Sequence, residues 1–354
     1  MRLTGSSDRR GRARKEDSIN RRLLVTGGTG FLGGHLARTL LAQGHDVRLM
    51  GRDFRAAGEL LAAGAIPLNA DLRDPAAVIA ACAGMDAVYH AGALSAPWGR
   101  TAEFEAINVG GTAAVVAGCR RHGVRRLVYV SSPSVVFDGY DHRDLAEDAP
   151  YPARFTSVYA RTKKRGEDLV NAASGNLETV ILRPKALFGP GDRSLLPRLI
   201  AAAQAGRLPQ IGDGRNLVDL TYVENAADAL LLALDAPGAV GRTYFITNGE
   251  HIPLWQVIRE ALATLGLPTQ LRHISVQVAL GVARLLEAYA TLSGREPLLT
   301  TYSVQILART QTYDTGAATR DLGYTPRISF AEGMRRTLLA LKTSGTEVAQ
   351  RSAP

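Results

Sequence analysis

The sequence predicts an α/β fold built on a doubly wound parallel sheet, followed by a smaller C-terminal region. Short apolar runs of strand type alternate with helical segments along the first half of the chain, and a glycine-rich turn joins the first run to the first helix. Pro184, Gly189, Pro190 and Gly191 then interrupt the alternation. At 354 residues and 46% hydrophobic, the chain is long enough for a large domain with a smaller cap.

Strands and helices are expected to alternate from residue 22 onward. The expected strands are 22–25, 46–50, 66–69, 87–90, 127–131 and 179–183, and the expected helices between them are 31–43, 75–83, 107–122 and 157–173. Right-handed crossovers place the carboxyl ends of parallel strands along one edge, where ligands bind in such folds. Beyond residue 183 we expect helices at 254–265 and 276–293 without a strand between them, while 220–234 and 243–247 return to the main sheet.

The glycine-rich turn, residues 26–33, directly follows the first expected strand and opens the first expected helix. Gly27 allows a tight turn, Gly30 lets the backbone approach a pyrophosphate, and Gly33 lets helix and strand pack closely. The free N–H groups at the start of the helix favour phosphates. The turn therefore predicts a Rossmann-type dinucleotide site made by Gly27, Thr29, Gly30, Phe31, Leu32 and Gly33.

The end of the second expected strand bears on the choice between NAD and NADP. An acidic residue there binds the ribose hydroxyl of NAD, whereas an arginine accommodates the extra phosphate of NADP. Gly51 stands where the acid is expected, and Arg52 follows it. We therefore expect NADP(H) to be favoured over NAD(H); the alternative is that Arg52 is a solvated turn residue and Asp53 binds the ribose.

The next two strand ends carry further candidates for cofactor contact. Asp71 and Leu72 follow the third strand and are expected near the adenine, while His90, Ala91 and Gly92 are expected along the diphosphate and ribose.

Tyr159 and Lys163 are four residues apart on an expected helix and therefore share a face. A free tyrosine loses its proton near pH 10, and a neighbouring ammonium is expected to lower that pKa. Lys163 can also hold the nicotinamide ribose. Residues 128–134 end a strand in hydroxyl groups, of which Ser132 is expected to hydrogen-bond the substrate oxygen beside Tyr159. These residues predict a site for interconverting an alcohol and a ketone.

In this order, the motifs resemble those of the extended short-chain dehydrogenases. The resemblance covers residues 22–341 and rests on the glycine turn, the His90 turn, the segment 108–112, the serine strand end, Tyr159 with Lys163, and the segments 182–184 and 188–192. Residues 131–139 and 212–223 resemble the 3β-hydroxysteroid and sterol dehydrogenase branch. Residues 195–199 and 244–250 resemble the bacterial 2-alkyl-3-oxoalkanoate reductases of olefin synthesis.

The resemblance implies a catalytic set of Ser132, Tyr159 and Lys163, with Ser131 the less favoured hydroxyl. It also implies that Asn108 kinks its helix and supports Lys163 through water, and that Pro184 contacts the cofactor. The expected reaction is reversible, NADPH-dependent reduction of a 3-oxo group in a lipid-like molecule, either a 2-alkyl-3-oxoalkanoate or a 3-oxosteroid or sterol.

The first alternative is a nucleotide-sugar epimerase or dehydratase of the same superfamily. A dehydratase would place an Asp-Glu pair after Ser132, where this chain has Pro133 and Ser134. An epimerase would more often carry Arg-Tyr-Phe-Asn at the sixth strand, where this chain has Leu-Arg-Pro-Lys at 182–185. A weaker alternative is an NAD(P)-binding sensor without catalysis.

These motifs divide the chain. We expect a disordered basic leader at 1–20, an NAD(P)-binding domain at 21–190 with returning segments at 217–247, a mainly substrate-binding region at 191–342 and a disordered tail at 343–354. The leader carries six of the basic residues against three acids, so it supplies a third of the formal charge of +9. The remaining charge is dispersed, which argues against nucleic acid as a partner.

The remaining expectations concern surroundings and partners. Cys82 and Cys119 have no spacing for a metal site, so both are expected in the core of a cytoplasmic protein and no metal is expected. No apolar run is long enough to span a membrane. The helix expected at 276–293 either packs on the core, lines an acyl or sterol channel, or touches a membrane surface. We expect a homodimer, and contact with a membrane or a pathway enzyme stays open.

Overall fold

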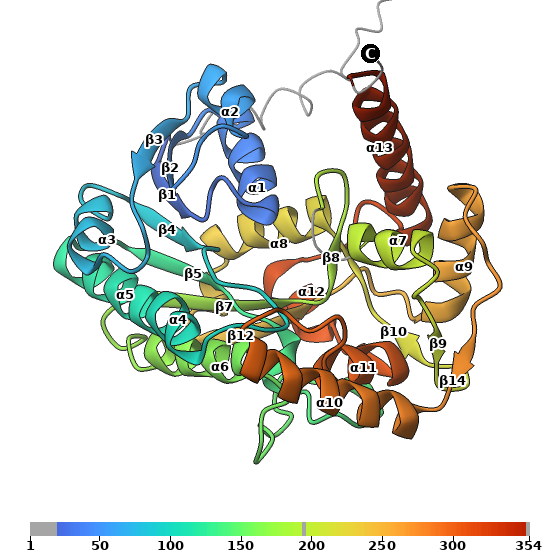
Figure 1. Cartoon of the computed structure of the whole chain (residues 1–354). Coiled ribbons are helices and arrows are strands. Elements are labelled where there is room, and N and C mark those ends of the chain that lie inside the picture. Colours follow the sequence, from blue (N-terminus) through green and yellow to red (C-terminus); the bar gives the residue numbers. More distant parts are fainter. Residues whose placement is uncertain (1–19, 193–195, 352–354) are drawn as a thin grey trace, which may run out of the picture.

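The computed structural model describes residues 20–192 and 196–351. Its main sheet consists of parallel strands, and their bounds are β1 Arg22–Thr26, β2 Asp46–Gly51, β3 Ile66–Asn69, β4 Ala87–His90, β5 Arg126–Val130, β7 Glu178–Pro184 and β12 Arg242–Ile246. They lie in the order β12-β7-β5-β4-β1-β2-β3 (Figure 1). The order runs outward in both directions from β1 and β4, so the predicted doubly wound parallel sheet is confirmed.

Helices cover both faces of this sheet. Those of the first half are α1 Phe31–Ala42, α2 Gly58–Ala62, α3 Pro75–Ala81, α4 Thr101–Phe104, α5 Gly111–Arg121 and α6 Val158–Asn171. The later ones are α7 Leu196–Gln204, α8 Val223–Asp235, α9 Leu254–Thr264, α10 Val276–Ser293, α11 Thr301–Ala308, α12 Gly316–Leu322 and α13 Phe330–Arg351.

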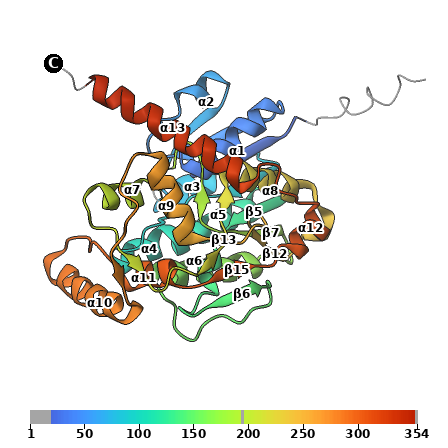
Figure 2. The same ribbon diagram turned by 90° about the vertical axis from the view of Figure 1, so that its right-hand side faces the viewer.

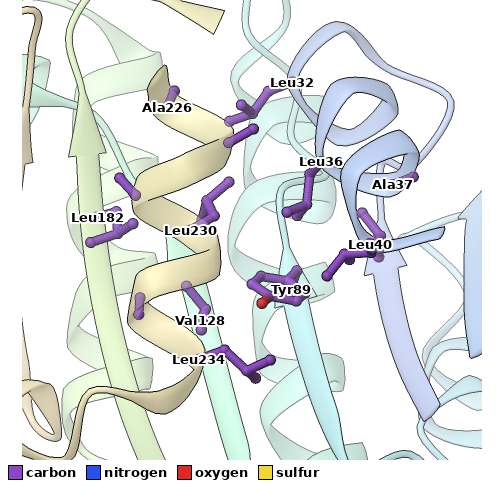
Figure 3. Packing of buried hydrophobic residues seen from close by; sticks show 14 of the residues in the cluster. Leu32, Leu36, Ala37, Leu40, Tyr89, Val128, Leu182, Ala226, Leu230 and Leu234 are labelled. Carbon is purple, nitrogen blue, oxygen red and sulfur yellow. The ribbon is translucent and has the colours of Figure 1, made fainter. Parts of the chain in front are cut away.

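Leucine and alanine side chains of α1 and α8 form the core on one face. Leu36 and Leu40 of α1 approach Tyr89 of the sheet, and Leu230 of α8 lies over the strand that carries Val128 (Figure 3). On the other face, α3, α5 and α6 form a second core that includes both buried cysteines. Each fully buried leucine contributes about 1.5–3 kcal/mol, so the sheet is a stable platform for the residues at its edge.

Smaller sheets combine strands of the C-terminal region with β6 and β8 from earlier in the chain. Their strands are β6 His142–Leu145, β8 Leu187–Phe188, β9 Gln210–Ile211, β10 Leu217–Val218, β11 Thr221–Tyr222, β13 Ile252–Pro253, β14 His273–Ile274 and β15 Gln311–Tyr313. They pair in the order β13-β10-β15-β6, and as β11 with β8 and β14 with β9.

The segment 217–247 returns to the main sheet in part, because β12 joins the sheet and α8 packs its apolar face against it, while β10 and β11 pair outside it. The short strand β14 also lies between α9 and α10, where we expected none. Strands of two residues carry too little periodicity to be recognised in a sequence.

The helix expected at 107–122 begins with a different geometry. Residues Glu105–Gly110 form a π-helical turn, and α5 follows from Gly111. Such turns widen the helix by one residue and are frequent at functional sites.

Both ends of the chain were expected to be disordered. Of the expected leader, residues 1–19 lie outside the described residues, and Asn20 Oδ1 accepts a hydrogen bond from the Asp46 N–H at 3.1 Å. At the other end, α13 continues to Arg351 with no proline to interrupt it, so it extends into the segment 343–354 that we expected to be a disordered tail (Figures 1 and 2). No helix among the described residues is long and apolar enough to cross a membrane.

Candidate active site

Tyr159 lies in the first turn of α6, facing the carboxyl end of β5. Ser157 caps this helix by accepting the Ala160 N–H at 3.1 Å, so the position of the first turn is defined. Ser132 follows β5, and its Oγ accepts the Ser134 N–H at 3.2 Å. The side chains of Ser132 and Ser95 are both within hydrogen-bonding reach of the Tyr159 hydroxyl. The structure thus brings Ser132 and Tyr159 together and adds Ser95, which we had not predicted.

The pKa of Tyr159 differs from the expectation. Burial raises it above its usual value of 10, and hydrogen bonds from Ser95 and Ser132 oppose the rise. We had expected Lys163 to lower it, but the Lys163 Nζ donates to the Val130 carbonyl at 2.6 Å and lies 4.0 Å from the centre of the Tyr129 ring. The ammonium therefore does not offset burial, and Tyr159 keeps its proton at neutral pH.

Lys163 itself is buried, and burial lowers its pKa from 10.5 to about 7. Glu167, one turn further along α6, opposes this shift. Glu167 is held by Arg183 of β7, whose Nε and one terminal nitrogen each donate to a separate carboxylate oxygen at 2.8 Å. This buried, bidentate pair joins α6 to the sheet one helical turn below Lys163.

A glycine lets α6 approach the sheet. A Cβ at Gly166 would lie 2.2 Å from the Tyr129 hydroxyl oxygen, which is closer than any Cβ contact in real proteins. Because residue 166 has no side chain, the ring of Tyr129 fits beneath Lys163 and sets its height above the sheet.

Asn108 lies in the π-helical turn and holds two parts of the site. Its amide accepts the Leu94 N–H at 2.7 Å and donates to the Leu94 carbonyl at 3.1 Å and to Thr162 Oγ1 at 3.0 Å. Asn108 therefore fixes both the segment that carries Ser95 and the residue before Lys163. The support of Lys163 through water stays a prediction.

The glycine turn fits the dinucleotide pyrophosphate. Gly27 has a φ of +66°, and a Cβ there would lie 2.7 Å from the Cα of Gly92. A Cβ at Gly33 would lie 2.3 Å from the Gly27 carbonyl oxygen. Gly30 precedes α1 without any side-chain cap, and the first turn of α1 holds no acid, so its N–H groups can receive an anion.

Side chains around this turn fall into two groups. Leu32, Ala91 and Pro184 line the same cavity as Ser132, Tyr159 and Lys163. Thr29 lies beside Gly51, and Phe31 lies beside Gly191.

His90 points into the interior rather than into the cavity. Its Nδ1 is 2.7 Å from Thr26 Oγ1 and its Nε2 is 3.0 Å from Thr112 Oγ1, and burial lowers its pKa to about 3. His90 is therefore neutral and ties β4 to β1 and α5. Contact of the His90 turn with a cofactor stays a prediction. The backbone of the turn, with Ala91 and Gly92, would make this contact instead of the His90 side chain.

The end of β2 presents a cation to solvent. The side chain of Arg52 is 68% exposed and lies 3.8 Å from the Asp71 carboxylate, which Arg73 binds at 2.6 Å. Both oxygens of Asp53 are engaged by Arg55. A Cβ at Gly51 would lie 2.9 Å from Thr29 Oγ1, so a larger residue would displace Thr29. Leu72 packs against Gly92 and Gly111 beneath this surface.

Two cavities meet at Tyr159. One has a volume of about 610 Å³ and extends from Leu32 and Lys163, past Ser132, to apolar side chains of α7, α9 and α11. The other, of about 1080 Å³, is lined by segments near α4, residues 153–158 and α10. Tyr159 and Tyr302 line both. No group of three or more metal-ligating side chains occurs among the described residues.

Sequence reasoning missed Ser95, Tyr302 and Lys185. Ser95 lies in a segment without periodicity. Tyr302 comes from α11, far along the chain, yet its hydroxyl reaches toward Ser134, and burial together with the nearby Tyr159 raises its pKa. Lys185 follows β7 and lines the smaller cavity. Only its place directly after a strand end could have indicated it.

Comparison with known proteins decides the family. The 3-beta hydroxysteroid dehydrogenase/isomerase family matches residues 24–276. The chain belongs to this family. It is an oxidoreductase of the extended short-chain dehydrogenase type, and its family is NAD(P)-dependent.

Three similar proteins support this family and the fold. The 2-alkyl-3-oxoalkanoate reductase of Stenotrophomonas maltophilia is 42% identical over 330 residues, which cover 89% of this chain and 98% of the relative. A decarboxylating sterol-4-alpha-carboxylate 3-dehydrogenase of Schizosaccharomyces pombe is 33% identical, over 89% of this chain and 96% of the relative. MoeE5 in complex with UDP-glucose and NAD has a TM-score of 0.72 at 25% identity, over 91% of this chain and 99% of that chain.

Proposed function

We propose that this dehydrogenase reduces the 3-oxo group of a lipid-like molecule with NADPH, and that the reaction is reversible. The substrate class is a 2-alkyl-3-oxoalkanoate or a 3-oxosteroid or sterol. One observation carries the proposal: the oxygen-binding groups of Ser132 and Tyr159 open into a cavity whose far walls are the apolar side chains of Leu199, Val257, Ile258, Leu299 and Ile306.

In this proposal the residues have separate roles. A bound nicotinamide supplies the hydride. Tyr159 donates the proton to the ketone oxygen, which Ser132 holds by a hydrogen bond. Lys163 binds the ribose hydroxyls, and Asn108 positions the Ser95 segment. Because burial raises the pKa of Tyr159, its hydroxyl holds the proton that reduction needs at neutral pH, whereas oxidation needs Tyr159 to release that proton first.

The surroundings of β2 support the preference for NADPH. The Arg52 guanidinium is exposed at the strand end, and no acidic side chain stands at Gly51. Asp53, the acid that could bind the ribose of NAD, is already paired with Arg55. A phosphate on the ribose would therefore meet the Arg52 cation, while the two nearby acids, Asp53 and Asp71, are already bound by Arg55 and Arg73.

The named substrates of the relatives agree with the apolar cavity. Both a 2-alkyl-3-oxoalkanoate and a sterol carboxylate combine a keto or hydroxyl group with a large apolar body. We further propose that α10, which does not line the smaller cavity, contacts a lipid surface. A homodimer and a contact with a pathway enzyme stay predictions.

The test is a series of 2-alkyl-3-oxo acids of increasing chain length, each reduced by the pure protein with NADPH. Each buried methylene adds about 0.8 kcal/mol, so kcat/KM is expected to rise about fourfold per carbon until the cavity is filled. A 3-oxosteroid and UDP-glucose are tested beside them. A flat series, or best turnover of the sugar nucleotide, would reject the lipid substrate.

A further inference from the structure

Lys185 is a buried cation in the substrate cavity that the reaction chemistry does not use. It directly follows β7, is 9% exposed and lines the smaller cavity together with Ser132 and Tyr159. Its Nζ donates a hydrogen bond of 2.7 Å to Oε1 of Gln311, whose side chain is neutral. An ammonium has three N–H donors, and among the described residues this is its only hydrogen bond.

The nearest acid does not neutralise Lys185 by a direct contact. Asp219 lies close enough to influence it, but one Asp219 oxygen accepts from His251 at 2.7 Å and the other accepts the Tyr313 N–H at 2.8 Å. Burial lowers the pKa of Lys185 from 10.5 to about 8, against the influence of Asp219, so most of the population is still protonated at neutral pH. A buried charge of this kind is costly unless an anion joins it.

The position of Lys185 matches the shape of a 3-oxo acid. β5 and β7 are neighbours with Val130 opposite Leu182, and the Ser131 N–H bonds the Leu182 carbonyl at 2.7 Å. Extending this register places Ser132 opposite Pro184, one residue before Lys185, across a strand spacing of about 4.8 Å. In a 3-oxo acid, the carboxylate carbon is separated from the ketone carbon by only one atom. A ketone held at Ser132 therefore has its carboxylate within reach of a lysine at 185.

We infer that Lys185 is the residue that binds the carboxylate of the substrate, so that the protein distinguishes a free 3-oxo acid from its ester. This inference rests on the proposed function, in which a 2-alkyl-3-oxoalkanoate already carries a carboxylate, and adds the side chain that recognises it. Ser131 supports it, because its hydroxyl is buried at the same strand end, lines the cavity and has no hydrogen-bond partner among the described residues. A second carboxylate donor is thus available beside the ammonium.

The cavity offers other cations, and these provide controls. Arg198 is paired with Glu296 at 3.3 Å. Arg207 also lines the cavity and is exposed to solvent. Its side chain forms no ion pair among the described residues. If the carboxylate lay at the rim, Arg207 would bind it instead of Lys185.

The experiment compares Lys185→Met, Lys185→Arg and Arg207→Met with the unchanged protein. Each is assayed on a long-chain 2-alkyl-3-oxo acid and on its methyl ester. Loss of a charge-assisted contact predicts that Lys185→Met lowers kcat/KM for the acid by about 10- to 100-fold. Activity on the ester should change less than about threefold, and Lys185→Arg should keep more activity on the acid than Lys185→Met. Arg207→Met should behave as the unchanged protein.

An equal loss on acid and ester would overturn the inference, because it would show that Lys185 only supports the cavity wall. An acid-specific loss in Arg207→Met alone would also overturn it. A second measurement needs no turnover: a saturated long-chain fatty acid should raise the melting temperature of the unchanged protein more than that of Lys185→Met, while its methyl ester should not distinguish them. If the unchanged protein reduces neither acid nor ester, the proposed function fails, and the fatty-acid comparison still decides the role of Lys185.

Discussion

In the proposed reaction, the Tyr159 hydroxyl donates the proton to the ketone oxygen. Tyr159→Phe removes the proton donor and leaves the ring, Lys163 and the glycine turn in place. We expect NADPH binding within about twofold of the unchanged protein and a loss of turnover of at least about a hundredfold. Cofactor fluorescence and initial rates measure the two quantities. Turnover close to normal would show that another group donates the proton.

The preference for NADPH is expected to depend on Arg52. Arg52→Ala removes the exposed cation at the end of β2 and should raise the KM for NADPH by about tenfold or more, because a charge-assisted bond to phosphate contributes about 1.5–3 kcal/mol. The KM for NADH should change little. Better use of NADH than NADPH by the unchanged protein would mean that the turn favours NAD.

Some residues of the candidate site could be predicted from the sequence and others could not. Tyr159 and Lys163 stand four apart on one helix, so their proximity follows from helical geometry alone. Ser95 and Tyr302 reach the same site from segments about two hundred residues apart, and only the packing of α11 against the main domain brings them together. The raised pKa of Tyr159 was missed for a similar reason, since burial depends on every neighbour at once.

Helix α6 is held to the sheet by the pair of Glu167 and Arg183. Glu167→Gln removes the charge from a carboxylate that is fully buried and should lower the free energy of unfolding by about 3 kcal/mol, because Arg183 is left buried without its counter-ion. Asp168→Asn on the exposed side of the same helix is the control and should cost less than about 1 kcal/mol. Urea unfolding of both variants measures the difference. Equal losses in the free energy of unfolding would mean that the buried pair stabilises the protein no more than the exposed pair does.

Helix α10 carries an exposed apolar stripe. Val278, Val282, Leu285, Tyr289 and Leu292 recur at helical spacing and are 46–89% exposed, while Ala279, Ala283 and Ala290 face the protein. Arg272 and Arg295 lie just beyond the two ends of the helix and are exposed, a charge pattern that suits an anionic lipid surface.

This stripe leads to a prediction about vesicles. The double variant Leu285→Ser, Tyr289→Ser should bind phosphatidylglycerol vesicles at least about tenfold more weakly than the unchanged protein, with its melting temperature preserved. Vesicle sedimentation measures the binding. Leu339→Ser, at an exposed leucine on α13, is the matched control and should bind normally. If the double variant binds as well as the control, the stripe does not contact lipid.

Elements of the main sheet were predictable because their strands are long enough to show a pattern and glycine marks their turns. The π-helical turn at Glu105–Gly110 was not, since its extra residue leaves the apolar spacing of the helix almost unchanged. Ala290 and Thr291 of α10 line the larger cavity, whereas α7, α9 and α11 line the smaller one, and a role of α10 in an acyl or sterol channel stays a prediction.

The stability of the whole molecule should depend on pH through Lys163. Its pKa is about 7 in the folded protein and 10.5 in the free side chain. Below pH 7 both folded and unfolded chains hold the proton, so the full cost of burying the charge is present. Between these values the unfolded chain binds more protons, and the free energy of unfolding therefore rises with pH.

Lys163→Met should remove this dependence. At pH 6 the variant is expected to be more stable than the unchanged protein by on the order of 2 kcal/mol, after allowance for the unpaired Val130 carbonyl. The gain should shrink by pH 9. Urea unfolding without cofactor at the two pH values measures it, with Lys164→Met as control because that ammonium pairs with the exposed Asp168. A gain that grows with pH would contradict the assignment of the buried charge.

The order of strands in the main sheet has a consequence for synthesis. Residues 22–184 contain all strands of the main sheet except β12, namely β1 to β5 and β7. Strand β12 and the side chains of Lys185 and Tyr302 come later in the chain. A ribosome therefore releases the nucleotide-binding half first, with the β7 edge uncovered and the buried Arg126 still lacking the carbonyl groups that the end of α8 provides. A nascent chain that stops at Pro184 has its glycine turn and its Tyr159, but the apolar side chains of α7, α9 and α11 that line the smaller cavity have yet to be made.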